Sequence, residues 1–141
     1  MVISGYISDN VKITKLQDHT VAGTSTINSD ELDMNGYDGV LFVTSYGTAA
    51  TGNTVTMEHS DTSGASFAAT LALKTSGASD EDVLLDVNRP VKRYVRLSAA
   101  RGTSSTLESI WGIQYKSRTL ALDNSTTGTI ALGQFNAPAA A

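Results

Sequence analysis

A cluster of carboxylates is the first feature of this chain that could do chemistry. Asp80, Glu81 and Asp82 are consecutive, and Asp86 follows on the same stretch. Oxygen-rich clusters suit a hard cation such as Ca²⁺, but this spacing is not that of an EF-hand loop. Consecutive acids more often form a solvated loop, and we favour that interpretation. The sequence therefore predicts no metal site.

The histidines and candidate nucleophiles give no clearer chemistry. His19 and His59 lie 40 positions apart, and neither has the spacing of a metal ligand. We expect His59 to be a half-buried packing residue. Asp61-Thr-Ser-Gly64 superficially resembles an aspartic-protease loop, but its inserted residues and the short chain argue against that assignment. No Gly-x-Ser-x-Gly elbow and no glycine-rich phosphate loop occurs. A triad assembled from distant residues stays open, but we predict no catalytic or cofactor-binding residue and expect a protein that is not an enzyme.

Positive charge is concentrated in one stretch. Of the ten Lys and Arg residues, seven lie between positions 89 and 118 with one acid, Glu108, whereas residues 1–88 hold three bases and twelve acids. The seven bases are Arg89, Lys92, Arg93, Arg96, Arg101, Lys116 and Arg118. The two parts could neutralise each other within one fold, or they could make contacts between copies or with another acidic protein. A nucleic-acid module is disfavoured because the whole chain carries a net charge of -4.

Two alternating runs must position these charges. They are Val91-Lys-Arg-Tyr-Val-Arg-Leu-Ser98 and Thr106-Leu-Glu-Ser-Ile-Trp-Gly-Ile-Gln-Tyr-Lys116. A period of two indicates strands with one buried face, and the intervening Gly102 and hydroxyl residues suit a reversal. We therefore predict a β-hairpin or a near-neighbour strand pair.

The second run puts the only tryptophan at its centre. Trp111 shares its face with Leu107, Ile113 and Tyr115, so we expect it to be a core anchor.

The first run puts one charge on the wrong face. Arg93 falls beside Val91, Val95 and Leu97, and an unpaired buried guanidinium is too costly to keep. Arg93 must therefore meet a carboxylate or reach a rim, and we predict a structural pair within the chain, for which the acids at 80–82 and 86 are the candidates just upstream.

The opposite face of the first run predicts an interface. Lys92, Tyr94 and Arg96 share it, and arginine beside tyrosine is typical of an interface centre. The further interface candidates in the basic stretch are Arg101, Lys116 and Arg118.

Composition favours an all-β fold. The 141 residues suffice for one domain. Charged residues make up only 17% of the chain, and Ser and Thr replace them, which suits strands and turns. The absence of cysteine excludes disulfides and thiolate metal sites. We see no signal peptide and no apolar run long enough to span a membrane, and we expect synthesis in a reducing cytoplasm.

The order of the chain predicts a single-domain β-sandwich, with a jelly roll as one possible form. Residues 1–35 should be an extended arm or edge strands, residues 36–133 the sandwich, and residues 134–141 a tail. Val40–Tyr46 is expected to be a buried central strand. The two ends, residues 1 to about 30 and 134–141, carry little apolar surface, so we expect them to pack mainly against other chains or to stay mobile.

The sequence also resembles a family of small virion proteins encoded among the head genes of tailed bacteriophages. The resemblance covers most of the chain from about residue 32. It rests chiefly on Asp80-Glu-Asp-Val83, Arg89-Pro90, Arg93-Tyr-Val-Arg96, Arg101-Gly-Thr-Ser-Ser-Thr-Leu-Glu108 and Gln114-Tyr-Lys-Ser-Arg-Thr-Leu120.

The resemblance implies a capsid decoration, or cement, protein. Such a protein binds the major capsid protein on the outer surface of the shell, often as a trimer, without cofactor, nucleic acid or membrane. It would be made in the host cytoplasm and end in the virion. A carbohydrate- or receptor-binding module on the virion is an alternative of another class, and a head-completion or tail-tube component is a third.

Overall fold

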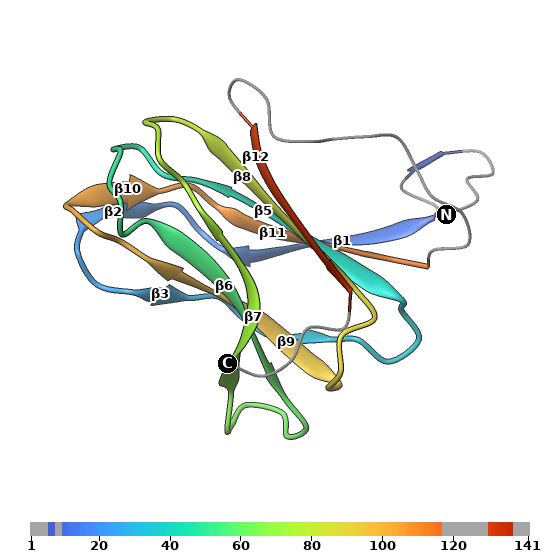
Figure 1. Ribbon diagram of the computed structural model, residues 1–141. Helices are drawn as coiled ribbons and strands as arrows, with labels where there is room; N and C mark the ends of the chain where they lie inside the picture. Colours follow the sequence, from blue (N-terminus) through green and yellow to red (C-terminus); the bar gives the residue numbers. More distant parts are fainter. Residues whose placement is uncertain (1–5, 8–9, 117–129, 137–141) are drawn as a thin grey trace.

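The computed structural model describes residues 6–7, 10–116 and 130–136. These residues form β-strands joined by turns and loops, and no α-helix occurs among them (Figure 1). One cluster of buried hydrophobic side chains serves all the major strands. The prediction of an all-β fold is therefore confirmed.

The first sheet has the strand order β1-β11-β5-β8-β12. Its neighbours are antiparallel except for the edge pair β8 and β12, which runs parallel. Its strands are β1 (Val11–Gln17), β5 (Gly39–Ser45), β8 (Asp82–Asn88), β11 (Ile110–Tyr115) and β12 (Ile130–Asn136).

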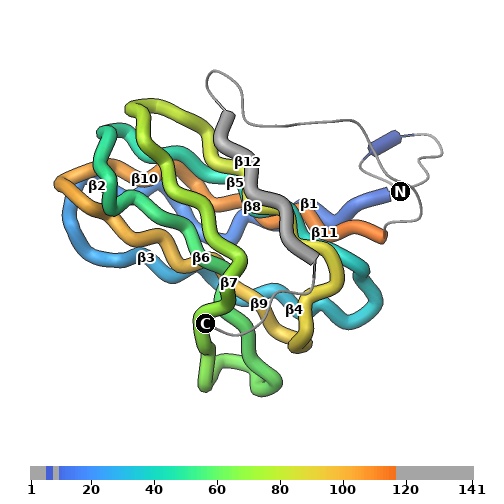
Figure 2. Tube along the Cα trace, viewed as in Figure 1, coloured from blue at the N-terminus to red at the C-terminus, as the bar shows by residue number. Residues whose placement is uncertain are grey.

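The second sheet has the order β3-β9-β6-β7, and β4 also pairs with β9 (Figure 2). Its strands are β3 (Ile27–Asn28), β4 (Leu32–Asp33), β6 (Thr54–Ser60), β7 (Ala68–Thr75) and β9 (Tyr94–Ala100). The short strands β2 (Thr20–Gly23) and β10 (Ser105–Leu107) form a separate pair.

The connectivity follows a simple rule. Eight strands make up the bulk of the two large sheets: β1, β3, β5, β6, β7, β8, β9 and β11. Counted in chain order, they read 1-8-3-6 in one sheet and 2-7-4-5 in the other. This is the strand order of a jelly roll, so it is compatible with the finer prediction. Strand β12 is an addition to that set, beside β8.

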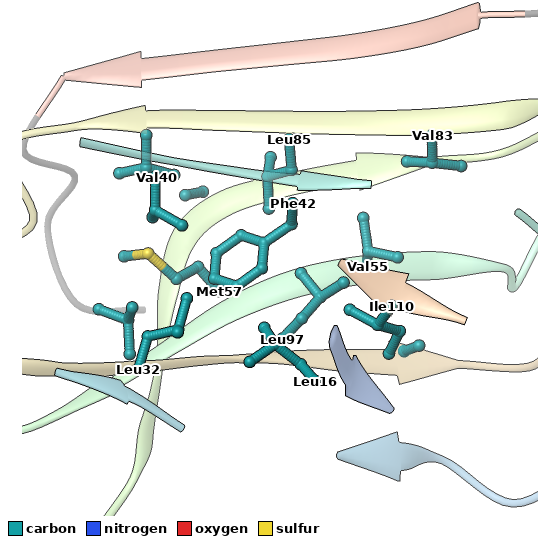
Figure 3. Close-up of a cluster of buried hydrophobic side chains, with 14 of the residues drawn as sticks. Leu16, Leu32, Val40, Phe42, Val55, Met57, Val83, Leu85, Leu97 and Ile110 are labelled. Atoms are coloured by element: carbon teal, nitrogen blue, oxygen red, sulfur yellow. The ribbon is translucent and has the colours of Figure 1, made fainter. Parts of the chain in front are cut away.

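Side chains from both sheets meet in the core. Phe42 and Leu85 from the first sheet lie close to Met57 and Leu97 from the second (Figure 3). The alternating burial of β5, β6, β8 and β9 supplies most of these residues. The predicted buried strand at Val40–Tyr46 corresponds to β5, at the centre of its sheet.

The predicted pairing of the two alternating runs is wrong. The first run becomes β9, which begins only at Tyr94 and pairs with β6 in the second sheet. The second run divides into β10 and β11, and β11 belongs to the first sheet. At the break, Glu108 donates its amide to the carbonyl of Ser45, and its own carbonyl accepts the hydroxyl of Thr44. A backbone carbonyl and a side-chain hydroxyl of β5 therefore hold a kink where the sequence suggested one strand.

The N-terminal segment is part of the domain. Strand β1 pairs with β11 along its whole length, which agrees with the edge-strand interpretation. Leu16, Leu32 and Met34 are buried in the core, however, so the expectation that this segment packs mainly against other chains is wrong. At the other end, β12 crosses the boundary expected at residue 133. The tail at 137–141 lies outside the described residues.

A buried arginine fastens the loop before β3 to the rest of the fold. Arg101 is 8% exposed, and its guanidinium donates to the carbonyls of Val21, Ser25 and Ser105 and to the hydroxyl of Ser25. Buried backbone carbonyls require such partners. Gly23 leaves the necessary room, because a Cβ atom there would lie 3.1 Å from the guanidinium. Arg101 was expected at an interface; the structure instead uses it inside the domain.

Leu16→Ala tests whether β1 belongs to the core. We expect it to lower the free energy of unfolding by about 2–5 kcal/mol, because it removes a buried side chain and leaves a cavity. Ile13→Ala on the same strand is the matched control. Ile13 is 51% exposed, so its truncation should cost under about 1 kcal/mol. Urea unfolding measures both variants. Equal, small losses would show that β1 is a dispensable arm.

His59 is a buried residue of β6. It is 2% exposed, more buried than expected, and neither ring nitrogen has a partner among the described residues. Burial lowers the pKa of His59 below 6.5, the positive charge of Lys92 lowers it further, and Asp61 opposes the shift. The neutral ring is therefore the form that the folded protein accepts.

This arrangement predicts an acid-sensitive stability. The unfolded chain binds a proton at His59 more readily than the folded one, so stability should fall as the pH drops below about 6.5. The contribution of His59 to the slope is at most about 1.4 kcal/mol per pH unit. His59→Leu should remove this contribution, whereas His19→Gln, at an exposed position, should retain it. Urea unfolding of the three proteins at pH values from 7.5 to 5 measures this dependence. If the free energy of unfolding of His59→Leu varied with pH as steeply as that of the wild type, His59 would not be the group responsible.

Candidate interaction surfaces

Strand β11 turns the tryptophan outward. Ile110, Gly112 and Gln114 are the buried residues of this strand, whereas Trp111 is 40% exposed. The prediction that Trp111 is a core anchor is therefore wrong. It fails because of the kink at residue 108, which puts the buried Leu107 and the exposed Trp111 on opposite sides although both positions are odd.

The buried face of β11 carries a polar residue, which hides it from a search for apolar positions. Gln114 is 1% exposed and donates its amide to the carbonyl of Asp33 at 2.8 Å. Gly112 has no side chain because a Cβ atom there would lie 2.6 Å from Leu32 Cδ1 and 2.9 Å from Leu16 Cδ1. A glycine and a glutamine do not look like a core face in the sequence.

The outer face of the first sheet is apolar around Trp111. The strand register places Ile13 beside Ile113 and Lys15 beside Trp111, and on the other side Leu41 and Val43 face β11. We define the Trp111 face as Ile13, Lys15, Leu41, Val43, Trp111 and Ile113. The Lys15 ammonium lies 6.0 Å from the indole centroid, within cation–π range.

A tyrosine marks one border of this face. Tyr115 lies across Gly39 and donates its hydroxyl to Asp86 of β8. Gly39 is required here, since a Cβ atom would overlap the tyrosine ring. Burial raises the pKa of Asp86, which its bond to Tyr115 partly offsets, and the pKa of Tyr115 is raised by burial and then by Asp86.

Sequence reasoning missed most of the Trp111 face, but one signal was available. The run Val40-Leu-Phe-Val43 is apolar on both faces of its strand, which is typical of strands covered on both sides. Its outward residues Leu41 and Val43 are only half-buried in the structure. The face therefore has the composition of a contact surface for a partner, with aliphatic side chains around one aromatic.

Arg93 pairs within the chain, but elsewhere than expected. It lies just before β9 with an exposed side chain, and it donates to both oxygens of Asp33 at 2.9 and 2.8 Å. These hydrogen bonds and a further one from the Asn35 amide lower the pKa of Asp33 to about 2. The acids at 80–82 and 86 are not its partners, and the expected buried position is wrong because β9 begins only at Tyr94, so Arg93 lies before the strand.

The predicted patch on the other face is largely occupied by internal contacts. Arg96 donates to Glu58 at 2.8 Å and stacks 4.4 Å from the ring centroid of Phe67. Lys92 lies 3.5 Å from Asp61, and the Arg93 guanidinium lies 5.3 Å from the Tyr94 ring. Of the remaining candidates, Lys116 is exposed, and Arg118 lies outside the described residues.

One groove lies next to this patch. This groove has a volume of about 400 Å³ and lies between the turn at 34–38 and the connection at 89–93. Its wall includes Arg89, which adopts a positive φ of 56°. The ten lining residues include no Ser, Thr, Cys or His, so the groove offers no serine- or cysteine-type nucleophile and no imidazole base.

Other candidate chemistry is not assembled in the described part of the chain. No group of three His, Cys, Asp or Glu residues there could hold a metal ion. Within the same residues, no helix has the length and apolarity needed to cross a membrane.

Comparison with known proteins gives no relative. No protein-family model, no curated protein and no solved structure matches this chain.

Arg93→Ala tests the exposed pair with Asp33. Because this variant removes the two bonds that lower the Asp33 pKa most, that pKa should rise toward 3.8 in a carboxyl NMR titration. Stability should change little, because the pair is exposed to solvent and screened. Lys92→Ala is the control and should leave the Asp33 titration unchanged. A severe loss of stability in Arg93→Ala would instead indicate a buried pair.

Proposed function

We propose that this protein is a non-enzymatic structural protein of a bacteriophage virion. Its role would be to decorate the capsid, binding the shell of major capsid protein from outside and stabilising the head. The observation that carries the proposal is the Trp111 face, an apolar sheet surface that the fold presents outward. The assignment to a virion rests on the resemblance to small head-gene proteins, and the all-β domain is compatible with that assignment.

The physical case begins with the side chains of this face. Trp111 and Ile13 expose 40% and 51% of their surface, although both lie in regular strands. Exposed apolar surface of this kind is disfavoured in water and becomes favourable on contact with a partner. Tryptophan is among the residues that contribute most to such contacts. Strands also provide a rigid surface, which reduces the entropy lost on binding.

The proposal includes several copies side by side, with a trimer favoured, and no nucleic acid. Copies arranged on a symmetric shell would each use the same face on equivalent capsid subunits. Lys116 remains a candidate for the rim of this contact, because it follows β11 and is exposed.

A carbohydrate- or receptor-binding module is the second candidate, and the exposure of Trp111 favours it. An indole can stack on a sugar ring. Sugar sites also need polar groups that bind hydroxyls, however, and Lys15 is the only polar member of the Trp111 face. The aliphatic surroundings therefore favour a protein partner.

Trp111→Ser tests the proposal. The protein should be added to phage particles that lack it, and bound copies counted by quantitative mass spectrometry. We expect hundreds of wild-type copies per particle and a raised temperature of DNA release. The variant should bind at least about thirty-fold more weakly, since a central tryptophan typically contributes 2 kcal/mol or more.

The matched control is Leu71→Ser on β7. Leu71 is 53% exposed but belongs to the other sheet, so this variant should bind like wild type. Unfolding should confirm that both variants fold. A wild-type protein present in a dozen copies or fewer would contradict decoration. Binding to a glycan array that disappears in Trp111→Ser would support the second candidate.

A further inference from the structure

Strand β12 is the exception in an otherwise antiparallel fold. The other strand pairs are all antiparallel, whereas β12 runs parallel to β8 over seven registered residues, from Ile130 opposite Asp82 to Asn136 opposite Asn88. Among the described strands, β12 is joined to its sheet only through β8, and β7 of the other sheet lies nearby (Figure 1). The eight strands in jelly-roll order are complete without it.

The edge that β12 covers would otherwise be open. Without β12, β8 is the last strand of its sheet and presents a row of unpaired backbone groups. Such an edge accepts any strand with suitable residues, from the same chain or from another. Pairing through backbone groups therefore does not by itself choose between the two.

The covalent connection does not choose either. Tyr115 ends β11 near Asn88, whereas Ile130 starts β12 near Asp82, at the far end of β8. Seven residues of strand and three strand spacings separate these points, roughly 27 Å in all. The fourteen steps from residue 116 to residue 130 can span up to about 45–50 Å. The connection is thus much longer than its path within one chain requires.

We propose that the β8 edge is a docking site for the 130–136 strand of a second copy of this chain. Each copy would receive this strand from a neighbour and give its own, so that every edge stays paired and no pairing is lost. Exchange within a closed ring keeps the same backbone hydrogen bonds, and its cost is mainly that of bringing the copies together. Neighbours held side by side on a shell have already met that cost. The inference therefore rests on the proposed function only in so far as that function places copies together.

The absence of cysteine from the chain permits a direct test. Leu84 and Leu132 are register partners, and adjacent strands bring Cα atoms within the 4.4–6.8 Å range of a disulfide. Full-length Leu84→Cys and Leu132→Cys proteins should be mixed, unfolded in urea, refolded together at high concentration and oxidised mildly. Non-reducing electrophoresis then separates disulfide-linked dimers from monomers. We expect several-fold more linked dimer from the mixture than from either variant refolded alone.

Two controls make each outcome decisive. The double variant, with both cysteines in one chain, reports whether β8 and β12 pair in register at all, as internal or intermolecular disulfide. A mixture of Leu84→Cys with Ser63→Cys, whose cysteine lies in an exposed loop, gives the level of random collision. The proposal is overturned if the 84/132 mixture does not exceed that level, or if the double variant forms no disulfide of either kind.

The test is separable from that of the proposed function. Linked dimers can form in solution without any capsid, and Trp111→Ser leaves both cysteine positions untouched. Failure of exchange with intact particle binding would reject only the shared strand. Successful exchange with no particle binding would reject only the capsid partner.

Discussion

The packing of side chains over Gly112 determines which face of β11 points into the core. Leu16 from β1 and Leu32 from β4 reach within 3 Å of where a Cβ atom would be, so any larger residue at this position would force these buried leucines to shift. With residue 112 inward, the alternation of the strand forces Trp111 and Ile113 outward. The N-terminal strands are therefore not accessories of the domain. They hold β11 in the one orientation that gives the protein an apolar outer surface.

How much of this could be read from the sequence depended on how local each signal was. The strands at β5, β6 and β8 were predictable because each alternates, or is apolar, within its own seven residues. The orientation of β11 was not, because it depends on the hydrogen bonds of Glu108 with Ser45 and Thr44, some 64 residues away. A short-range pattern carried through a kink gives the wrong face for every residue beyond it.

The charged residues show the same limit. The concentration of bases between 89 and 118 is visible in the sequence, but the partner of each base is not. Arg101 and Lys116 looked alike as interface candidates. One is buried among three backbone carbonyls, and the other is exposed. The difference lies in residues 21–25, the end of β2 and the loop after it, whose carbonyls need donors and whose Gly23 leaves space for the guanidinium.

The outer faces of the two sheets differ in how far their polar groups are paired and in whether an aromatic side chain is exposed. On the second sheet, Arg96 is bonded to Glu58 and Thr54 to Thr75, so these polar groups are matched to one another. Leu71 and Leu73 of β7 are exposed apolar residues on the same sheet, but no aromatic side chain is exposed beside them on that strand. The Trp111 face has almost no polar groups to match, and each apolar side chain there gains from being covered. We therefore expect a partner of this domain to meet the first sheet, where aliphatic side chains surround an exposed tryptophan.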